Sequence, residues 1–128
     1  MVQPLIELSV DDDKVYVQLY VMVTANLEQI REKVVQDQFE FSQHAVDQSI
    51  IRHISVQELR EAVTSGEIIE DYPDDKRGPS CLIFGFTLTG RPLHIQCSYP
   101  SRPLVKVITL YEPDPKLWVN FKVRRTQK

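Results

Sequence analysis

The sequence is most informative over residues 80–111, SCLIFGFTLTGRPLHIQCSYPSRPLVKVITLY. Side chains alternate with a period of two over residues 80–88 and again over residues 93–98, as they do in β-strands. A Thr-Gly pair lies between the two runs, and its glycine supplies the positive φ that a two-residue turn needs. The pattern predicts a β-hairpin, followed by a third strand over residues 104–111.

The two-residue turn also predicts the register of the hairpin. In that register Phe84 lies opposite Ile95, and one face of the hairpin is uniformly apolar. His94 lies opposite Gly85 on the other face, where no side chain covers it. We expect this second face to be open to solvent, with Lys106 of the third strand near His94. The core-facing residues of the third strand are then Val105, Val107, Thr109 and Tyr111.

Length and composition are those of one globular domain. The chain has 128 residues, of which 42% are hydrophobic and 26% charged. No apolar run approaches the roughly 20 residues of a membrane span, and the N-terminus lacks the basic and apolar segments of a signal peptide. Cys81 and Cys97 fit neither a disulfide scaffold nor a zinc site. We place them on opposite faces of the hairpin and expect free thiols in a reducing cytoplasm.

Charge is distributed unevenly along the chain. Residues 1–75 hold five basic and sixteen acidic side chains, a net charge of −11, whereas residues 76–128 hold ten and two, a net charge of +8. A basic half is typical of proteins that bind a polyanion such as nucleic acid. The alternative is that the two halves fold together and their charges cancel.

The first 75 residues predict a hairpin and then helices. Two extended runs, residues 4–10 and 15–23, flank an acidic turn, and the second would join the sheet or form a dimer contact. Helical spacing follows over residues 26–38, Ser42 can cap a second helix, and a capping box, Ser55-x-x-Glu58, opens a third. Helices before an antiparallel sheet predict an α+β fold, with the helices packed on one face.

Five ordered blocks resemble a known family. They are SQHA (residues 42–45), RHIS (52–55), GEIIEDYP (66–73), RPLH (91–94) and ITLYEP (108–113). Over residues 26–125 the chain resembles the bacterial family called domain of unknown function 4258, and residues 1–25 form an extension of the same single domain. The sequence departs from the family pattern at Gln48, where arginine is usual, and at His53, where glycine is usual.

The resemblance implies a RelE-like fold, related to the small endoribonuclease toxins of toxin–antitoxin modules and close to the MqsR branch. It implies RNA, free or bound to the ribosome, as substrate and a cognate antitoxin, of the zinc-finger type in that branch, as partner. No cofactor is implied. The three histidines are not spaced as a zinc site.

Metal-independent RNA cleavage requires a base for the 2′-OH, an acid for the leaving 5′-oxygen, and cations that stabilise the phosphorane. Histidine suits both proton transfers near neutral pH, and arginine matches phosphate oxygens. The second helix presents His44, Gln48 and Arg52 on one face. The expected catalytic residues are His94, His44 and Arg52, and the expected RNA- or phosphate-binding residues are Arg91, Lys106, Gln96 and Tyr111.

Each of these residues has a structural alternative. His44 can bond to the backbone at the start of its helix, Arg52 can pair with a nearby carboxylate, and Tyr111 can belong to the core. Three functions therefore remain open. An endoribonuclease toxin predicts that His44, Arg52 and His94 converge in one open basic cleft. A catalytically inactive relative that binds RNA or a protein predicts that they are scattered or buried in salt bridges. A homodimeric interaction module predicts a sheet that continues across a two-fold axis through residues 15–23.

Overall fold

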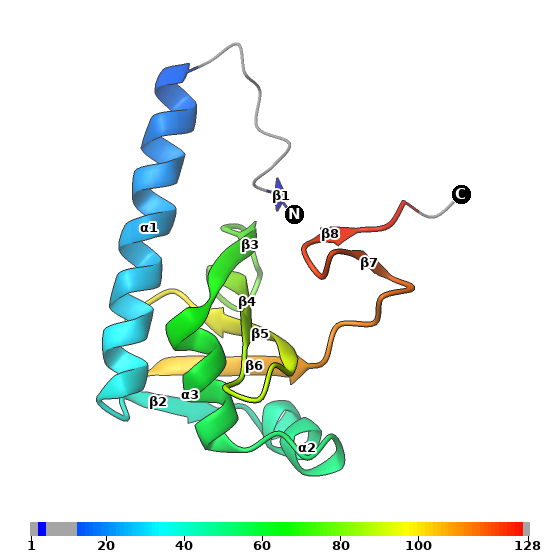
Figure 1. The fold of residues 1–128 in the computed structure, drawn as a ribbon. Coiled ribbons are helices and arrows are strands. Elements are labelled where there is room, and N and C mark those ends of the chain that lie inside the picture. The colour runs from blue at the N-terminus through cyan, green and yellow to red at the C-terminus, as the bar shows by residue number, and fades with distance from the viewer. Residues whose placement is uncertain (1–2, 5–12, 127–128) are drawn as a thin grey trace.

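The computed structural model describes residues 3–4 and 13–126 of the chain. This part forms three helices, a six-stranded sheet and a small two-stranded sheet, so the predicted α+β class is confirmed (Figure 1). The elements are β1 (Gln3–Pro4), α1 (Asp13–Val35), β2 (Phe39–Phe41), α2 (Gln43–Ile51), α3 (Val56–Ser65), β3 (Glu67–Tyr72), β4 (Ser80–Phe86), β5 (Pro92–Ser98), β6 (Val105–Tyr111), β7 (Trp118–Val119) and β8 (Val123–Arg124).

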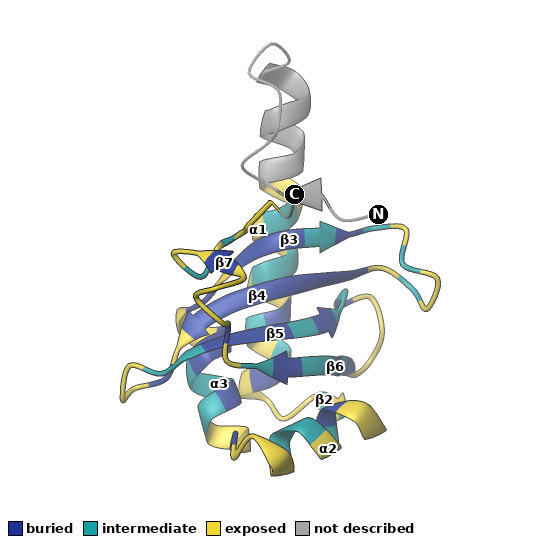
Figure 2. Cartoon of the chain, turned by 90° about the vertical axis from the view of Figure 1, so that its right-hand side faces the viewer, coloured by how far each residue is buried: buried dark blue, intermediate teal, exposed yellow. Residues whose placement is uncertain are grey.

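The six-stranded sheet has the order β1-β3-β4-β5-β6-β2, and only β2 runs parallel to its neighbour. Helices α1 and α3 pack behind the sheet as Figure 2 is drawn, and α2 lies at its lower edge. Residues such as Ile30 of α1, Leu59 of α3 and Ile95 of β5 form the core between the two layers and are fully buried. In the described part of the chain, no helix has both the length and the apolar composition that crossing a membrane requires.

The β4–β5 hairpin differs from the predicted register by one residue. Phe84 pairs with His94, because the loop contains three residues rather than two. The Thr87 N–H donates to the Arg91 carbonyl over 2.9 Å and so closes this loop. Gly90 has a φ of 88°, which is the conformation of the last residue in a three-residue hairpin loop. The shift exchanges the two faces of β4 relative to the prediction, whereas Leu93, Ile95 and Cys97 of β5 keep the predicted core face.

The face of the hairpin beneath the helices includes three small residues, Cys81, Gly85 and Cys97. Cys81 and Cys97 lie directly opposite each other on it as buried free thiols, so their predicted placement on opposite faces was wrong. Gly85 lies under α3, where a Cβ atom would stand 1.8 Å from the carbonyl oxygen of Ala62. Helix α3 therefore packs directly on the backbone of β4.

Strand β6 contains a bulge at Ile108, where its register with β5 shifts. Val107, on the N-terminal side of the bulge, faces the core as predicted. Beyond the bulge Leu110 takes the core position, and Thr109 and Tyr111 pair with Gln96 and His94 on the other face. The predicted core positions of Thr109 and Tyr111 were therefore wrong, because one extra residue reverses the alternation.

The predicted N-terminal hairpin was also wrong. Residues 15–23 lie within α1, and the other predicted strand, residues 4–10, lies outside the described residues except for Pro4 in β1. Val23 packs against the core four residues before Leu27, so the apolar stripe of the helix begins earlier than predicted. This helical spacing prevails over the β-branched composition of the segment.

The predicted helix starts of α2 and α3 are confirmed. The Ser42 hydroxyl accepts a 3.0 Å hydrogen bond from the Ala45 N–H at the start of α2. At the start of α3, the Ser55 hydroxyl accepts from the Glu58 N–H and the Glu58 carboxylate accepts from the Ser55 N–H, each over 3.0 Å. These caps fix where the segment between the two helices turns.

The C-terminal hairpin, residues 114–126 with strands β7 and β8, covers part of the second face of the sheet (Figure 2). Trp118 is buried there against Phe84, Leu82 and Tyr72. His94 lies beneath it and is completely inaccessible. The expectation of a face that is open throughout was therefore wrong, and the open part lies over β5 and β6 beyond the hairpin.

Candidate functional site

The three residues predicted to share one face of α2, His44, Gln48 and Arg52, form a stripe that lies along β6. The Nε2 atom of His44 is 3.4 Å from the Thr109 hydroxyl. The Gln48 carboxamide oxygen accepts hydrogen bonds from the Thr109 hydroxyl (2.5 Å) and from the Leu110 N–H (3.0 Å). The Arg52 guanidinium lies 5.8 Å from the centre of the Tyr111 ring. We call this contact between His44, Gln48 and Arg52 of α2 and Thr109 and Tyr111 of β6 the seam. His44 and Arg52 remain exposed, so two of the three expected catalytic residues lie on one accessible seam.

Ser42 explains why this seam forms. Its hydroxyl accepts from Ala45 as the helix cap and donates to the Ile108 carbonyl over 2.9 Å. Its own N–H donates to the Val107 carbonyl, which continues the parallel pairing of β2 with β6. The chain therefore leaves the sheet edge at a fixed point, and the first turn of α2 brings His44 over β6.

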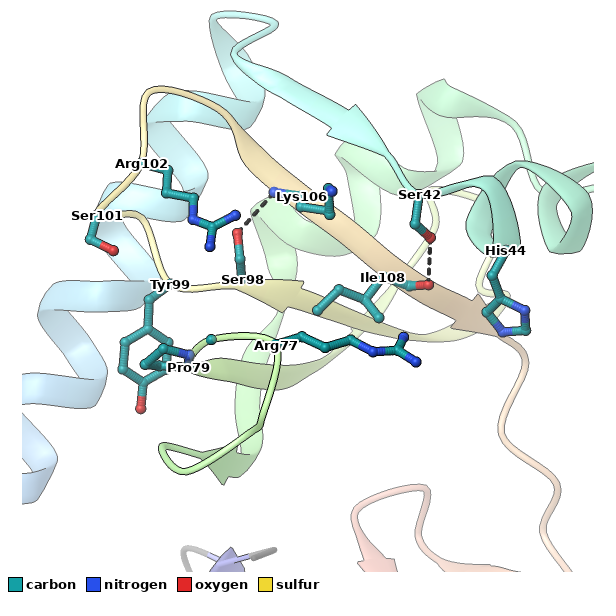
Figure 3. Close-up of a pocket in the computed structure, with 11 residues that line it drawn as sticks. Ser42, His44, Arg77, Pro79, Ser98, Tyr99, Ser101, Arg102, Lys106 and Ile108 are labelled. Atoms are coloured by element: carbon teal, nitrogen blue, oxygen red, sulfur yellow. Dashed lines mark hydrogen bonds between the residues drawn. The ribbon is translucent and has the colours of Figure 1, made fainter.

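A cavity of about 340 Å³ opens beside the seam (Figure 3). Its walls come from α2, from the loops before β4 and after β5, and from β6. Figure 3 shows Arg77 and Arg102 extending from those two loops across the strands, with Lys106 on β6 and His44 at one end. The polar side chains that line it are Ser42, His44, Arg77, Ser98, Tyr99, Ser101, Arg102 and Lys106.

The cavity is electropositive. Arg77 and Arg102 are exposed and form no ion pair with any residue in the part of the chain that the structure describes. Lys106 has one carboxylate nearby, that of Glu40, at 4.0 Å. Burial raises the pKa of the Tyr99 hydroxyl, and so does its hydrogen bond to Asp71, so Tyr99 is a neutral wall of the site. The expected placement of Lys106 on the open face is confirmed.

Arg91 lies elsewhere and is engaged in structural contacts. It forms ion pairs with Glu58 and Glu112 and donates to the carbonyl oxygens of Arg52 and His53, both over 2.8 Å. Its pKa is raised, chiefly by the hydrogen bond to Glu112. The guanidinium holds the link between α2 and α3 against the β4–β5 hairpin. Phosphate binding by Arg91 would require these contacts to break, and Arg91 does not line the cavity.

His94 does not lie in the open site. Its Nε2 atom is 2.6 Å from the Phe121 carbonyl oxygen, its Nδ1 atom is 3.2 Å from the Tyr111 hydroxyl, and the ring packs edge-on against Trp118. Burial lowers the pKa of His94. The predicted exposure of His94 was wrong, and Tyr111, half-buried, separates it from Arg52. Gln96 donates to Ser80 over 3.1 Å and is also outside the cavity.

The prediction missed Arg77 and Arg102, which stand in the loops at one end of the β4–β5 hairpin. Ser80 pairs with Ser98, so the loop that enters β4 and the loop that leaves β5 must lie together. An antiparallel pair always joins these two ends. The arginines therefore could have been placed side by side from the hairpin prediction alone.

Comparison with known proteins identifies one relationship. A family model described as Domain of unknown function (DUF4258) matches residues 41–112, which is more than half of the chain. No curated protein and no solved structure matches the chain. The matched segment contains α2, α3 and β3–β6, and with them the seam and every residue that lines the cavity, whereas α1 and the C-terminal hairpin lie outside it. This confirms the resemblance in the sequence blocks: the chain belongs to the DUF4258 family.

Proposed function

We propose that the protein binds RNA through backbone phosphates at the cavity between α2, β6 and the two loops. The observation that carries the proposal is the convergence of Arg77, Arg102 and Lys106 around one open cavity of about 340 Å³. Guanidinium groups bind phosphate oxygens as a fork, and an ammonium group adds a mobile charge. Arg77, Arg102 and Lys106 can therefore contact the same stretch of RNA phosphates, even though the chain carries a net charge of −3.

Cleavage of the bound RNA is the second candidate function, and the position of His44 favours it. His44 is exposed, lines the cavity and lies next to the cations. In the proposed step His44 takes the 2′-OH proton, the 2′-oxygen attacks the phosphorus, and the bond to the 5′-oxygen breaks. Arg102 stabilises the phosphorane, and Lys106 gives a proton to the leaving 5′-oxygen. The protein would then be an endoribonuclease toxin that needs no metal ion.

The same proposal specifies a partner and a compartment. Resemblance to the RelE-like toxins, and to their MqsR branch in particular, supports a cognate antitoxin of the zinc-finger type in a bacterial cytoplasm. The free thiols Cys81 and Cys97 are compatible with that reducing compartment. An antitoxin that neutralises the protein would cover the seam or the cavity and compete with RNA.

Binding is tested with a fluorescently labelled single-stranded RNA and two double variants that lose the same charge. In one, Arg77→Gln and Arg102→Gln remove the cavity arginines. In the other, Lys116→Gln and Arg125→Gln remove two exposed cations of the C-terminal hairpin. Loss of two phosphate contacts should raise Kd by about 10-fold or more in the first variant and less than about 2-fold in the second. Equal losses in the two variants would contradict a site at the cavity.

Cleavage is tested by incubating RNA, free and ribosome-bound, with the protein in EDTA. His44→Ala should abolish cleavage, whereas His94→Gln should retain it, because His94 is buried away from the cavity. Cleavage that survives in His44→Ala would remove His44 from the mechanism. If the unmodified protein binds RNA but cleaves none, binding alone is the function and the enzymatic proposal fails.

A further inference from the structure

The C-terminal hairpin is attached to the sheet by few contacts. The described backbone–backbone hydrogen bonds of residues 114–125 stay within the segment, for example from the Arg125 N–H to the Leu117 carbonyl. The hairpin reaches the six-stranded sheet through two ion pairs, Arg124 with Glu70 and Lys122 with Glu67, through the Phe121 carbonyl, and through the apolar packing of its aromatic rings. The family match also ends at residue 112, before the hairpin begins. It is therefore a separate layer laid over a complete sheet.

The turn of the hairpin has an unfavourable backbone conformation. Asn120 and Phe121 have φ values of 51° and 63°, and a bulky aromatic residue rarely adopts this left-handed region. The conformation directs the Phe121 carbonyl at His94 and sets the Phe121 ring 5.9 Å from that of Phe84. Residues in strained conformations persist where surrounding contacts stabilise them. The hydrogen bond between His94 and the Phe121 carbonyl is such a contact and helps to keep the turn in place.

His94 is held as a neutral ring. Because its Nε2 atom lies 2.6 Å from the Phe121 carbonyl oxygen, this nitrogen carries the hydrogen and donates. The Nδ1 atom then accepts from the Tyr111 hydroxyl over 3.2 Å. The ring is completely buried, with its centre 4.4 Å from that of Trp118, so a second proton on Nδ1 would place a charge where no water can solvate it.

Burial lowers the pKa of His94, and neither the hydrogen bond to the Phe121 carbonyl, which raises this pKa, nor the charged neighbours offset the burial. From β3, Glu70 favours the protonated ring, but it is already bound by Arg124 of β8 and by the Tyr72 hydroxyl. Arg124 disfavours the protonated ring. On β6, Tyr111 is neutral and has the Arg52 guanidinium over its ring. Strands β4 and β7 contribute the uncharged rings of Phe84 and Trp118. Closure of the hairpin and protonation of His94 therefore oppose each other.

We propose that residues 114–126 form an acid-released cap: protonation of His94 detaches the β7–β8 hairpin and exposes the face of the sheet that carries His94 and Tyr111. The ring of Tyr111 already borders the open seam at Arg52, so release extends that seam across β5. The cap thus regulates how much of the second face is accessible. The inference depends on the packing around His94 and not on RNA binding.

Trp118, the single tryptophan of the chain, reports directly on the cap. Its fluorescence emission is recorded from pH 8 to pH 4.5 together with far-UV circular dichroism, in the unmodified protein, in His94→Gln and in His53→Asn. Glutamine keeps an N–H donor but cannot be protonated in this range, and His53 is an exposed histidine outside the cap. The unmodified protein and His53→Asn should show a red shift below about pH 6.5, with the circular dichroism unchanged, and His94→Gln should show none.

A second measurement needs no variant. In nuclear magnetic resonance spectra, the Trp118 indole N–H and the His94 ring should titrate with the same midpoint. Different midpoints, a red shift that persists in His94→Gln, or emission that changes only when the circular dichroism changes would each overturn the proposal.

Discussion

Gly85 lies where β4 passes directly beneath the backbone of α3. In Gly85→Ala the new Cβ would stand 1.8 Å from the Ala62 carbonyl oxygen, which is main chain and cannot rotate away. We expect a loss of about 3 kcal/mol or more in the free energy of unfolding, measured with urea, because α3 must move off the sheet.

Gly90→Ala is the matched control for this prediction. Gly90 has a φ of 88°, and nothing lies within 4 Å of the position of a Cβ atom. The alanine there should cost only about 1 kcal/mol, from backbone strain without overpacking. A Gly85→Ala protein as stable as Gly90→Ala would show that α3 does not pack on bare backbone.

The residues of the site differed in how far the sequence could place them. The stripe of His44, Gln48 and Arg52 depended on helical spacing within one capped helix, and it was predicted correctly. The burial of His94 could not be predicted, because the C-terminal hairpin that covers it has strands of only two residues. The length of the turn decided instead which residue of β4 lies opposite His94, since a Thr-Gly pair suits both a two-residue loop and the end of a three-residue loop.

Helix α2 protects the edge of β6 beyond the short strand β2. Gln48 bonds to the Leu110 N–H, which would otherwise be an unpaired donor of the sheet edge. Gln48→Ala should therefore cost about 1–3 kcal/mol of unfolding free energy and should speed hydrogen exchange at Leu110. Gln57→Ala removes an exposed glutamine bonded to Glu61 on α3 and should change stability by less than about 0.5 kcal/mol. Equal effects of the two variants would argue against edge protection.

The start of α3 makes the fold sensitive to acid. The pKa of Glu58 is lowered, first by its hydrogen bond from the Ser55 N–H and then by Arg91. As the pH falls, the Glu58 carboxylate of the unfolded chain is protonated before that of the folded chain. Glu58 therefore contributes stability above about pH 4.5, and this contribution is lost as the pH falls through its lowered pKa. In urea titrations Glu58→Gln should be less stable than the unmodified protein at pH 6, and the two should converge towards pH 3. A constant difference across this range would exclude Glu58 ionisation as its cause.

Helices and strands inside the family segment followed their sequence signals in type, although not in the register of β4 with β5, whereas residues 15–23 and the C-terminal hairpin outside it did not. The capping serines of α2 and α3 marked their starts correctly. Residues 15–23 are rich in β-branched side chains, which predict a strand, and the apolar stripe of α1 that reaches the core includes Val23 but lies mostly beyond this segment, at Leu27, Ile30 and Val34. The C-terminal hairpin has strands of only two residues, which are too short for a recognisable alternation.

In the whole molecule, the acidic and basic halves of the sequence cancel only in part. Lys122 pairs with Glu67 and Arg124 with Glu70, so the C-terminal cations neutralise carboxylates of β3. Arg77, Arg102 and Lys106 are accessible cations that converge at the cavity, whereas Lys116 and Arg125 lie exposed on the C-terminal hairpin. The charge asymmetry along the chain predicts a polyanionic partner, which stays a prediction, and the sequence could not show which cations the fold would pair internally.

This residual charge predicts how RNA binding depends on salt. For a single strand, log Kobs falls with log[salt] with a slope of about −0.7 per phosphate contact, so contacts from Arg77, Arg102 and Lys106 give a slope of about −2. The Arg77→Gln and Arg102→Gln double variant should reduce the slope to about −0.7, whereas the Lys116→Gln and Arg125→Gln variant should leave it near −2. Fluorescence anisotropy titrations between about 50 and 200 mM salt measure both slopes. The same slope in the two variants would mean that RNA meets the protein away from the cavity, since only the first removes cations that line it.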